Sequence, residues 1–302
     1  RDLNHKQLGC MIYQVEMRGI TIFQLTDLYS HVERRCEKEA WKNYLQLPLH
    51  PYSVNTYDVA RYVIRPGPPI AEDRLADLVA ARETSGVRVS HDYAKELTEP
   101  HIASPDVHVD EENQRIIMYF HGLEAAARQH SRVATSKNGI DFETLPSDIG
   151  RTYYRAFAWD DMTYAIAMPG QFYRSEDGLK DFETGPLLFE STMRHSAVIV
   201  RDGKLFVFWT RVGDAPETIL LSTIELTEDW TDWQESPEVE VLRAEFHWEG
   251  AKAPIEPSVR STAYGYVNQL RDPALFVDDG VVYLLYAVAG ESGIALARVT
   301  FD

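Results

Sequence analysis

A strand–turn–strand unit recurs four times between residues 101 and 302, and this repetition constrains the fold more than any other feature of the chain. Each copy joins two apolar runs through a short polar turn, such as Asp279-Gly280. The runs are apolar on both faces, so we expect strands that are covered on both sides. The copies are SPDVHVDEENQRIIMYFHG (104–122), YYRAFAWDDMTYAIAMPG (153–170), RHSAVIVRDGKLFVFWTRVGD (194–214) and RDPALFVDDGVVYLLYAVAG (271–290).

A second, more polar strand pair follows each of the first three copies. These pairs are RVATSKNGIDFETLP (132–146), FYRSEDGLKDFETGP (172–186) and ILLSTIELTEDWTDWQES (219–236), and the last copy ends with GIALARVTFD (293–302). Four-strand modules of about 40–50 residues are typical of propeller blades. The sequence therefore predicts an all-β protein, a five-bladed β-propeller. Four blades are visible in the repeat, and the fifth, an irregular first blade, would have to come from residues 1–100. Two stacked sandwiches are the alternative, which the in-phase turns disfavour.

The first hundred residues do not follow the repeat. We expect residues 1–100 to form an N-terminal mixed α/β segment that completes the first blade and closes the ring, while residues 101–302 form the propeller blades. Within the segment, the sequence predicts two strands, at 10–17 and 20–25, and helices at 26–45 and 71–83. The last copy lacks an outer strand, which this segment could supply.

Composition narrows the classes of partner. A formal net charge of -17 disfavours nucleic acid and anionic membranes and suits a neutral or cationic ligand. No apolar run approaches the roughly 20 residues that span a bilayer. Cys10 and Cys36 form no CxxC pair, so we expect a cytoplasmic protein, or a secreted one if a signal peptide preceded Arg1. Nothing in the sequence indicates the oligomeric state.

Charged residues gather where the copies begin. In a propeller the innermost strands converge on a central channel, so these residues should meet in space. The candidates are Asp106, Arg155, Arg194, His195, Arg271 and Asp272, joined by Glu256 and Arg260 from the phrase EPSVR. Two carboxylates can share acid and base work on a glycosidic bond, while arginine and histidine hold hydroxyl groups. The set therefore favours a small-molecule carbohydrate as substrate.

Each candidate also has a structural interpretation. The aspartates could accept backbone N–H groups at strand starts, the arginines could pair with them, and His195 could be a hydrogen-bonded core histidine. A second polar set, at the ends of the second strands, is expected mainly to build loops and salt bridges, with His121 as a further substrate contact. It comprises His121, Arg211, Asp214 and Glu291. Trp159, Trp209, Tyr153 and Tyr154 fit sugar platforms or packing between blades equally well.

The sequence gives little evidence for a metal site. His108 and His121 lack the pattern of a zinc site. We therefore expect that no cofactor is required. Whether the central channel holds a divalent cation is left open by the sequence.

Four phrases in order carry a resemblance to a known group of enzymes. They are SPDV (104–107), MRHSA (193–197), EPSVR (256–260) and LRDPALF (270–276). At these residues the chain resembles the five-bladed propeller glycoside hydrolases that include families 43 and 117, and it looks closest to uncharacterised members. The resemblance implies an O-glycosyl hydrolase acting on an oligosaccharide or glycoside, with an aspartate base, a glutamate acid and a second aspartate that tunes the acid, and mostly with inversion.

The resemblance also implies roles for particular residues. Asp272 falls on the tuning aspartate, and Glu256 is the candidate acid with His195 as its rival. The base normally comes from the first blade, but residues 1–100 contain no Asp-Pro strand opening followed by a Tyr-Leu-Tyr strand. Asp106 is the substitute candidate. This departure keeps two alternatives open, a catalytically degenerate carbohydrate-binding propeller and a glycoside phosphorylase.

Overall fold

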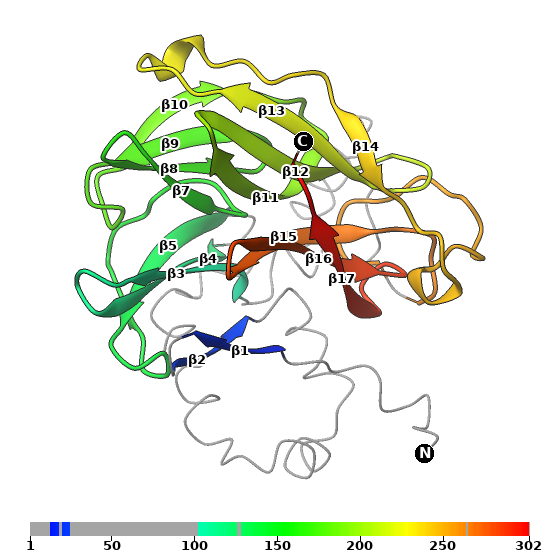
Figure 1. Ribbon diagram of the computed structural model, residues 1–302, viewed down its shortest axis with the longest axis horizontal. Coiled ribbons are helices and arrows are strands. Elements are labelled where there is room, and N and C mark those ends of the chain that lie inside the picture. Colours follow the sequence, from blue (N-terminus) through cyan, green and yellow to red (C-terminus); the bar gives the residue numbers. More distant parts are fainter. Residues whose placement is uncertain (1–12, 18–19, 25–101, 126–127, 264, 302) are drawn as a thin grey trace.

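The computed structural model describes residues 13–17, 20–24, 102–125, 128–263 and 265–301 (Figure 1). In this part of the chain, four antiparallel sheets are arranged as the blades of a propeller (Figure 1), which confirms the all-β propeller prediction. The helical structure of these described residues consists of two 3-10 turns, η1 (Trp230–Asp232) and η2 (His247–Glu249). No helix among the described residues is long and apolar enough to cross a membrane.

Successive strands of the chain are neighbours within each sheet. Sheet I contains β3 (Ile102–Asp110), β4 (Arg115–Ala125), β5 (Arg128–Ser136) and β6 (Glu143–Thr144). Sheet II contains β7 (Arg155–Trp159), β8 (Met162–Ala167), β9 (Gln171–Ser175) and β10 (Glu183–Leu187). Sheet III contains β11 (Met193–Arg201), β12 (Lys204–Arg211), β13 (Ile219–Glu225) and β14 (Val239–Leu242). Sheet IV contains β15 (Arg271–Asp278), β16 (Val281–Val288) and β17 (Gly293–Val299).

The turns explain why the copies stay in phase. Asp202-Gly203 and Asp279-Gly280 have positive φ at both positions, the backbone that a two-residue hairpin turn requires. At the next turn outward, the Ser136 hydroxyl accepts the N–H of Gly139 (2.9 Å), and Ser175 accepts the N–H of Gly178 in the same way (3.1 Å). The recurring Ser-x-x-Gly phrase is thus a serine-capped turn that leads to the outer strand.

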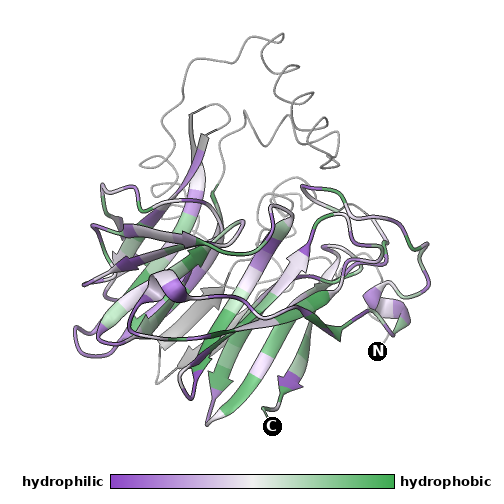
Figure 2. Cartoon of the chain, turned by 90° about the horizontal axis from the view of Figure 1, so that it is seen from above, coloured by the Kyte–Doolittle hydropathy of each residue, from purple (hydrophilic) through white to green (hydrophobic). Residues whose placement is uncertain are grey.

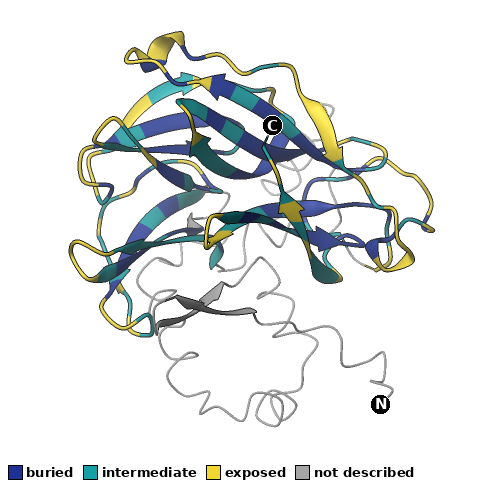
Figure 3. Ribbon diagram, viewed as in Figure 1, coloured by how far each residue is buried: buried dark blue, intermediate teal, exposed yellow. Residues whose placement is uncertain are grey.

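Neighbouring sheets pack face to face through apolar side chains. Alternate residues of one strand serve opposite faces: Tyr164 and Ile166 on β8 join a cluster with sheet III, while Ala165 and Ala167 join a cluster with sheet I. A third cluster joins sheets III and IV. The middle strands β8, β9, β12, β13 and β16 are accordingly mostly buried, whereas β10, β14 and β17 contain no buried residue (Figure 3). Many of the hydrophilic residues lie in the connections (Figure 2). No comparable cluster links sheets IV and I among the described residues.

The structure corrects the expected number of blades and leaves most of the N-terminal prediction untested. The number of blades is four in the described part of the chain, and five was expected. The strands predicted at 10–17 and 20–25 are confirmed as β1 (Tyr13–Met17) and β2 (Ile20–Gln24), but they form a separate two-stranded sheet and no blade. The two predicted helices, both cysteines and most of the proposed closing segment lie outside the described residues.

Candidate functional site

Three of the four inner strands carry an irregularity at the same place, near their first residues. The pairing register shifts between Ala103 and Asp106 on β3, between Met193 and Ser196 on β11, and between Arg271 and Ala274 on β15. These are the β-bulges that re-aim side chains, often beside active sites. The charged starts of the copies are therefore the points where the inner strands depart from regular pairing.

The sequence accounts for two of these bulges. Pro105 and Pro273 have no N–H to donate to a ladder, so they fit an irregular position better than a paired one. The residues before them, Ser104 (φ 51°) and Asp272 (φ 48°), have left-handed backbone. Aspartate adopts this region more readily than most residues. Non-glycine residues in it are found preferentially at functional sites.

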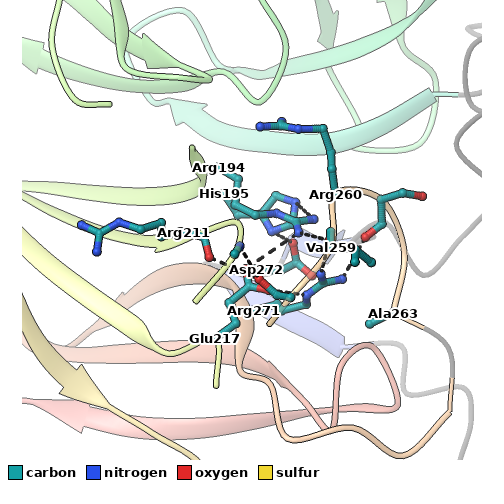
Figure 4. Close-up of polar contacts among 12 residues, drawn as sticks. Arg194, His195, Arg211, Glu217, Val259, Arg260, Ala263, Arg271 and Asp272 are labelled. Carbon is teal, nitrogen blue, oxygen red and sulfur yellow. Dashed lines mark hydrogen bonds and ion pairs between the residues drawn. The ribbon is translucent and has the colours of Figure 1, made fainter. Parts of the chain in front are cut away.

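A buried carboxylate, Glu217, lies between two arginines from different sheets (Figure 4). Its Oε2 atom accepts a hydrogen bond from Nε of Arg271 at 2.9 Å, and its Oε1 atom lies 3.8 Å from Nη1 of Arg194. Burial of Glu217 raises its pKa, but the Arg271 and Arg194 guanidinium groups outweigh this effect and lower it. Glu217 is therefore ionised and ties β15 to β11.

Arg271 has partners on every side. Its Nη1 atom donates to Glu291 (2.8 Å) and to the Ser261 carbonyl (3.0 Å), and its Nη2 atom donates to the Val259 carbonyl (3.0 Å). The side chain is fully buried, and Glu217 and Glu291 hold its pKa above the ordinary value although burial opposes the charge. Arg271 thus organises the site, with its donors already used.

His195 and Asp272 form a close pair beside this network (Figure 4). Nδ1 of His195 lies 2.5 Å from Oδ1 of Asp272; the histidine side chain is 3% exposed and the aspartate 14%. Burial of Asp272 raises its pKa, but His195 and the Arg194 and Arg271 guanidinium groups outweigh burial and lower it to about 2. Asp272 is therefore a carboxylate at neutral pH. Its Oδ2 atom has no hydrogen-bond partner among the described residues.

The geometry also indicates a tautomer for His195. Nη2 of Arg194 lies 3.3 Å from Nε2 of the imidazole, and a guanidinium can only donate. That contact is a hydrogen bond when Nε2 carries no proton, and Nδ1–H then donates to Asp272. Both ring nitrogens are engaged, so His195 orients Asp272 and is poorly placed to exchange protons itself.

Three aromatic rings connect this pair to sheets I and II. Tyr153, immediately before β7, lies between His121 and His195, with ring centroids 4.7 Å away on each side. Its backbone N–H donates to Nδ1 of His121 at 3.4 Å, and its φ is 59°. The tyrosine is partly exposed. The site therefore combines a carboxylate with a flat ring surface.

A second carboxyl group lies at the same end of sheet III. Asp214 follows β12, whose last residue, Arg211, pairs with Met193 at the start of β11. The Asp214 carbonyl accepts the N–H of Ser258 (2.9 Å), next to the segment that wraps Arg271. Its carboxyl group lies 3.8 Å from Arg211.

Several neighbouring charges affect Asp214. Burial raises its pKa, Arg211 opposes that effect, and the carboxylates of Glu217, Glu190 and Glu238 add to it, so the net direction is upward. The pKa of Asp214 is therefore shifted in the opposite direction to that of Asp272.

Five of the predicted site residues come together. His195, Asp272, Arg194 and Arg271 share contacts, and His121 joins them through Tyr153. The expected salt bridges are also present: Arg211 pairs with Glu190, and with Glu238 at 2.6 Å, and Glu291 pairs with Arg271.

Arg155 and Arg260 lie nearby but serve the framework. Nε of Arg155 donates to the Ser196 carbonyl (2.9 Å) and Nη1 to the Ser104 carbonyl (3.2 Å), so this side chain joins three inner strands. Arg260 is buried and donates to Sδ of Met168 at 3.4 Å. Neither guanidinium contacts Asp272.

Asp106 and Glu256, the expected base and acid, lie elsewhere. Oδ2 of Asp106 accepts the N–H of Ala156 on β7 (2.7 Å) and contacts Nε2 of His108 (2.8 Å), so this carboxylate lies between sheets I and II. Glu256 is exposed and has no hydrogen bond or ion pair within the described part of the chain. No contact joins either residue to Asp272.

Sequence reasoning missed Glu217 and gave little weight to Tyr153 and Asp214. Glu217 stands two residues before the third strand β13, as Glu291 does before β17, so this shared position was the signal that could have found it. Among the described residues, no group of three or more His, Cys, Asp or Glu side chains could hold a metal ion. The cation in the channel stays a prediction.

Comparisons with known proteins give one sequence relative and several distant structures. No family model matches the chain. The chain is 38% identical over 221 residues to an uncharacterized protein of Acanthamoeba polyphaga mimivirus, covering 67% of this chain and 62% of the viral protein. It thus spans less than two thirds of that relative's length.

The solved structures are glycosidases of low identity. A thermostable family-43 glycoside hydrolase has a TM-score of 0.48 at 14% identity, covering 70% of this chain and 76% of the other. The Cellvibrio cellulosa alpha-L-arabinanase complexed with arabinohexaose has a TM-score of 0.44 at 10% identity, covering 67% and 75%. A structure from the GH130 family of mannoside phosphorylases, which contains glycoside hydrolases that target beta-1,2 mannosidic linkages in Candida mannan, has a TM-score of 0.48 at 12% identity. The match covers 71% of this chain and 69% of the other. The fold assignment rests on the four sheets themselves.

Proposed function

We propose that this propeller is carbohydrate-active and hydrolyses a glycosidic bond, with Asp272 as the general base. The supporting observation is one carboxylate that is ionised, partly exposed and held by a single oxygen on His195, at a bulge where the inner strands meet. This role differs from the tuning role that the family resemblance implies. Because Asp272 is held by one neighbour only, its second oxygen can take a ligand.

The proposed reaction is a single displacement by water. Asp272 takes a proton from the water, whose oxygen bonds to the anomeric carbon while the bond to the leaving oxygen breaks. A pKa of about 2 makes Asp272 a weak base. Water becomes more acidic as it bonds to a carbon with developing positive charge, and the carboxylate also stabilises that charge. The low pKa keeps Asp272 ionised before the reaction, so that it can accept this proton.

We assign the acid role to Asp214. Its pKa is raised above the ordinary aspartate value, in the direction that a proton donor to the leaving oxygen requires, whereas the pKa of Asp272 is lowered. Carboxyl groups whose environments separate their pKa values in this way are the usual acid and base of glycoside hydrolysis.

Aryl and alkyl glycosides test these assignments together. Asp272→Asn should reduce kcat by about 10³-fold on every cleaved substrate, within the range for a lost proton-transfer group. Asp214→Asn should reduce kcat for alkyl glycosides strongly but spare dinitrophenyl glycosides, whose leaving group needs no proton. Asp232→Asn, at an exposed aspartate, is the matched control. Unchanged turnover in Asp272→Asn would remove the proposal, and ¹H NMR of the first-formed anomer tests inversion.

Phosphorolysis is less well supported than hydrolysis. A phosphate site needs basic groups with free donors, and Arg271 and Arg194 already bind Glu217 and backbone carbonyls. Turnover should therefore not require inorganic phosphate. Measurable binding of oligosaccharide without any turnover would instead favour a carbohydrate-binding propeller.

A further inference from the structure

An exposed aromatic pair lies on the long connection between β14 and β15. Phe246 is 55% exposed and Trp248 is 56% exposed, and their rings stack on each other with centroids 5.4 Å apart and planes 3° apart. Tyr266, 44% exposed, lies at the other end of the same loop. Soluble proteins seldom leave several large aromatic side chains together on the surface unless the surface binds something.

A buried carboxylate holds this loop in place. Oε2 of Glu249 accepts the N–H groups of Glu245 (2.8 Å) and Phe246 (3.0 Å), and its Oε1 accepts the hydroxyl of Tyr286 on β16 (2.8 Å). The Glu249 carbonyl also accepts the N–H of Ala289 (2.9 Å). A buried carboxylate with three donors fixes the backbone on both sides of the rings. The loop is therefore anchored to sheet IV.

Two further contacts make the loop rigid. At Gly250, with φ 98°, any Cβ would lie 2.1 Å from the Val267 carbonyl oxygen, so the two halves of the loop touch through backbone. The Tyr266 hydroxyl donates to the His247 carbonyl at 2.6 Å. Its oxygen also lies 2.7 Å from Nδ1 of His247. Polar groups consequently border the stacked rings.

We propose that Phe246 and Trp248 form a second carbohydrate-binding surface, which holds a neutral oligosaccharide or polysaccharide chain. The choice of a sugar as ligand rests on the proposed function. A flat ring with a polar border suits the C–H face of a pyranose, and a protein with a formal net charge of -17 disfavours acidic polymers. The same connection supplies the Val259 and Ser261 carbonyls to Arg271, so one segment of the protein carries both the rings and part of the site.

Retardation in native gels containing a soluble polysaccharide tests this surface without catalysis. The probes are linear arabinan, mannan and β-1,3-galactan, with polygalacturonate as the acidic comparison, and all variants are built on Asp272→Asn. Trp248→Ala should weaken retardation by the best neutral polymer about tenfold, as expected for one lost aromatic contact. Phe246→Ala should weaken it as well. Leu296→Ala, at a leucine 55% exposed on β17, should have no effect.

The outcomes separate the two proposals. Lost retardation in Trp248→Ala together with an inactive wild type would support the surface and remove hydrolysis. Turnover of small glycosides with no retardation, or with equal retardation in Trp248→Ala, would overturn the surface and leave hydrolysis standing. A change of oligomeric state in Trp248→Ala would also overturn it, because the rings would then cover a second copy of the chain. In an active protein, Trp248→Ala should raise KM for the polymer and leave KM for aryl glycosides unchanged.

Discussion

The inner strands β3 and β15 begin with the same bulge but place an aspartate differently in it. On β3 the order is Ser104, Pro105, Asp106, and on β15 it is Asp272, Pro273, Ala274. The residue before the proline has left-handed backbone in both.

The two positions have different environments. In the bulge, Asp272 pairs with His195 on a neighbouring blade and lies beside Arg194 and Arg271. Two residues later, Asp106 accepts the N–H of Ala156 and contacts His108, so it joins sheets I and II. The same side chain thus belongs to the buried charge network at one position and binds the backbone of the next sheet at the other. Position relative to the bulge decides which contacts the carboxylate makes.

The largest expected effect concerns the group that fixes the β15 bulge. Glu217→Ala should lower the free energy of unfolding by about 3–5 kcal/mol, because it removes one of the two carboxylate partners of the fully buried Arg271 charge. Glu225→Ala, which breaks the exposed Lys204–Glu225 pair (2.6 Å), is the matched control and should cost about 0–1 kcal/mol. Urea denaturation of both variants measures the difference. Equal losses would show that the buried network does not stabilise β15.

How much of the site could be predicted from the sequence depends on the bulges at the starts of β3 and β15. The repeat predicted that His195, Asp272, Arg194 and Arg271 meet, because each begins an inner strand. It also placed Asp106 in this set, because Asp106 lies near the start of a copy. Aligning the prolines pairs Asp272 with Ser104, and the difference in environment follows. The fold class was predictable from turn and strand periodicity.

The rest depended on contacts that no local pattern encodes. Glu217 is defined by two arginines that are distant in sequence, and the stacking of Tyr153 between two histidines depends on how three blades pack. The described part of the chain has four blades where five were expected. The fifth was expected to come from residues 1–100, where the described strands β1 and β2 form a separate two-stranded sheet.

A smaller effect is expected at the start of β3. Asp106→Ala should lower the free energy of unfolding by about 1.5–3 kcal/mol, the usual contribution of a hydrogen bond to a charged acceptor, because the Ala156 N–H loses its partner. Turnover of any cleaved glycoside should stay within about threefold of wild type, since Asp106 is not a proton-transfer group in this scheme. Denaturation and kinetics on the same preparation test both parts. A stable but inactive Asp106→Ala would reverse the comparison and return the base role to Asp106.

The pH dependence of stability tests whether the environment of Asp272 keeps it ionised in the folded protein. Its pKa is about 2 in the folded protein against an ordinary value of 3.8, so its contribution of about 2 kcal/mol is present above pH 4 and lost as the pH falls toward 2. The free-energy difference between wild type and Asp272→Asn should therefore shrink over that interval. Asp106 and Glu217 also have lowered pKa values, but they are common to both proteins and cancel in the difference. A difference that does not change with pH would mean that His195 does not hold Asp272 ionised.

The smallest effect is expected at Glu256, which lies outside both bulges. Glu256→Gln should leave kcat, KM and the free energy of unfolding nearly unchanged, since exposed substitutions usually alter stability by less than about 0.5 kcal/mol. The side chain is exposed and has no partner in the described part of the chain, so nothing there holds it toward Asp272. Kinetics on an alkyl glycoside, whose leaving group needs a proton, provide the most sensitive measurement. Loss of alkyl-glycoside turnover in Glu256→Gln, with dinitrophenyl glycosides spared, would transfer the acid role from Asp214 to Glu256. It would also mean that the loop from β14 to β15 moves when substrate binds.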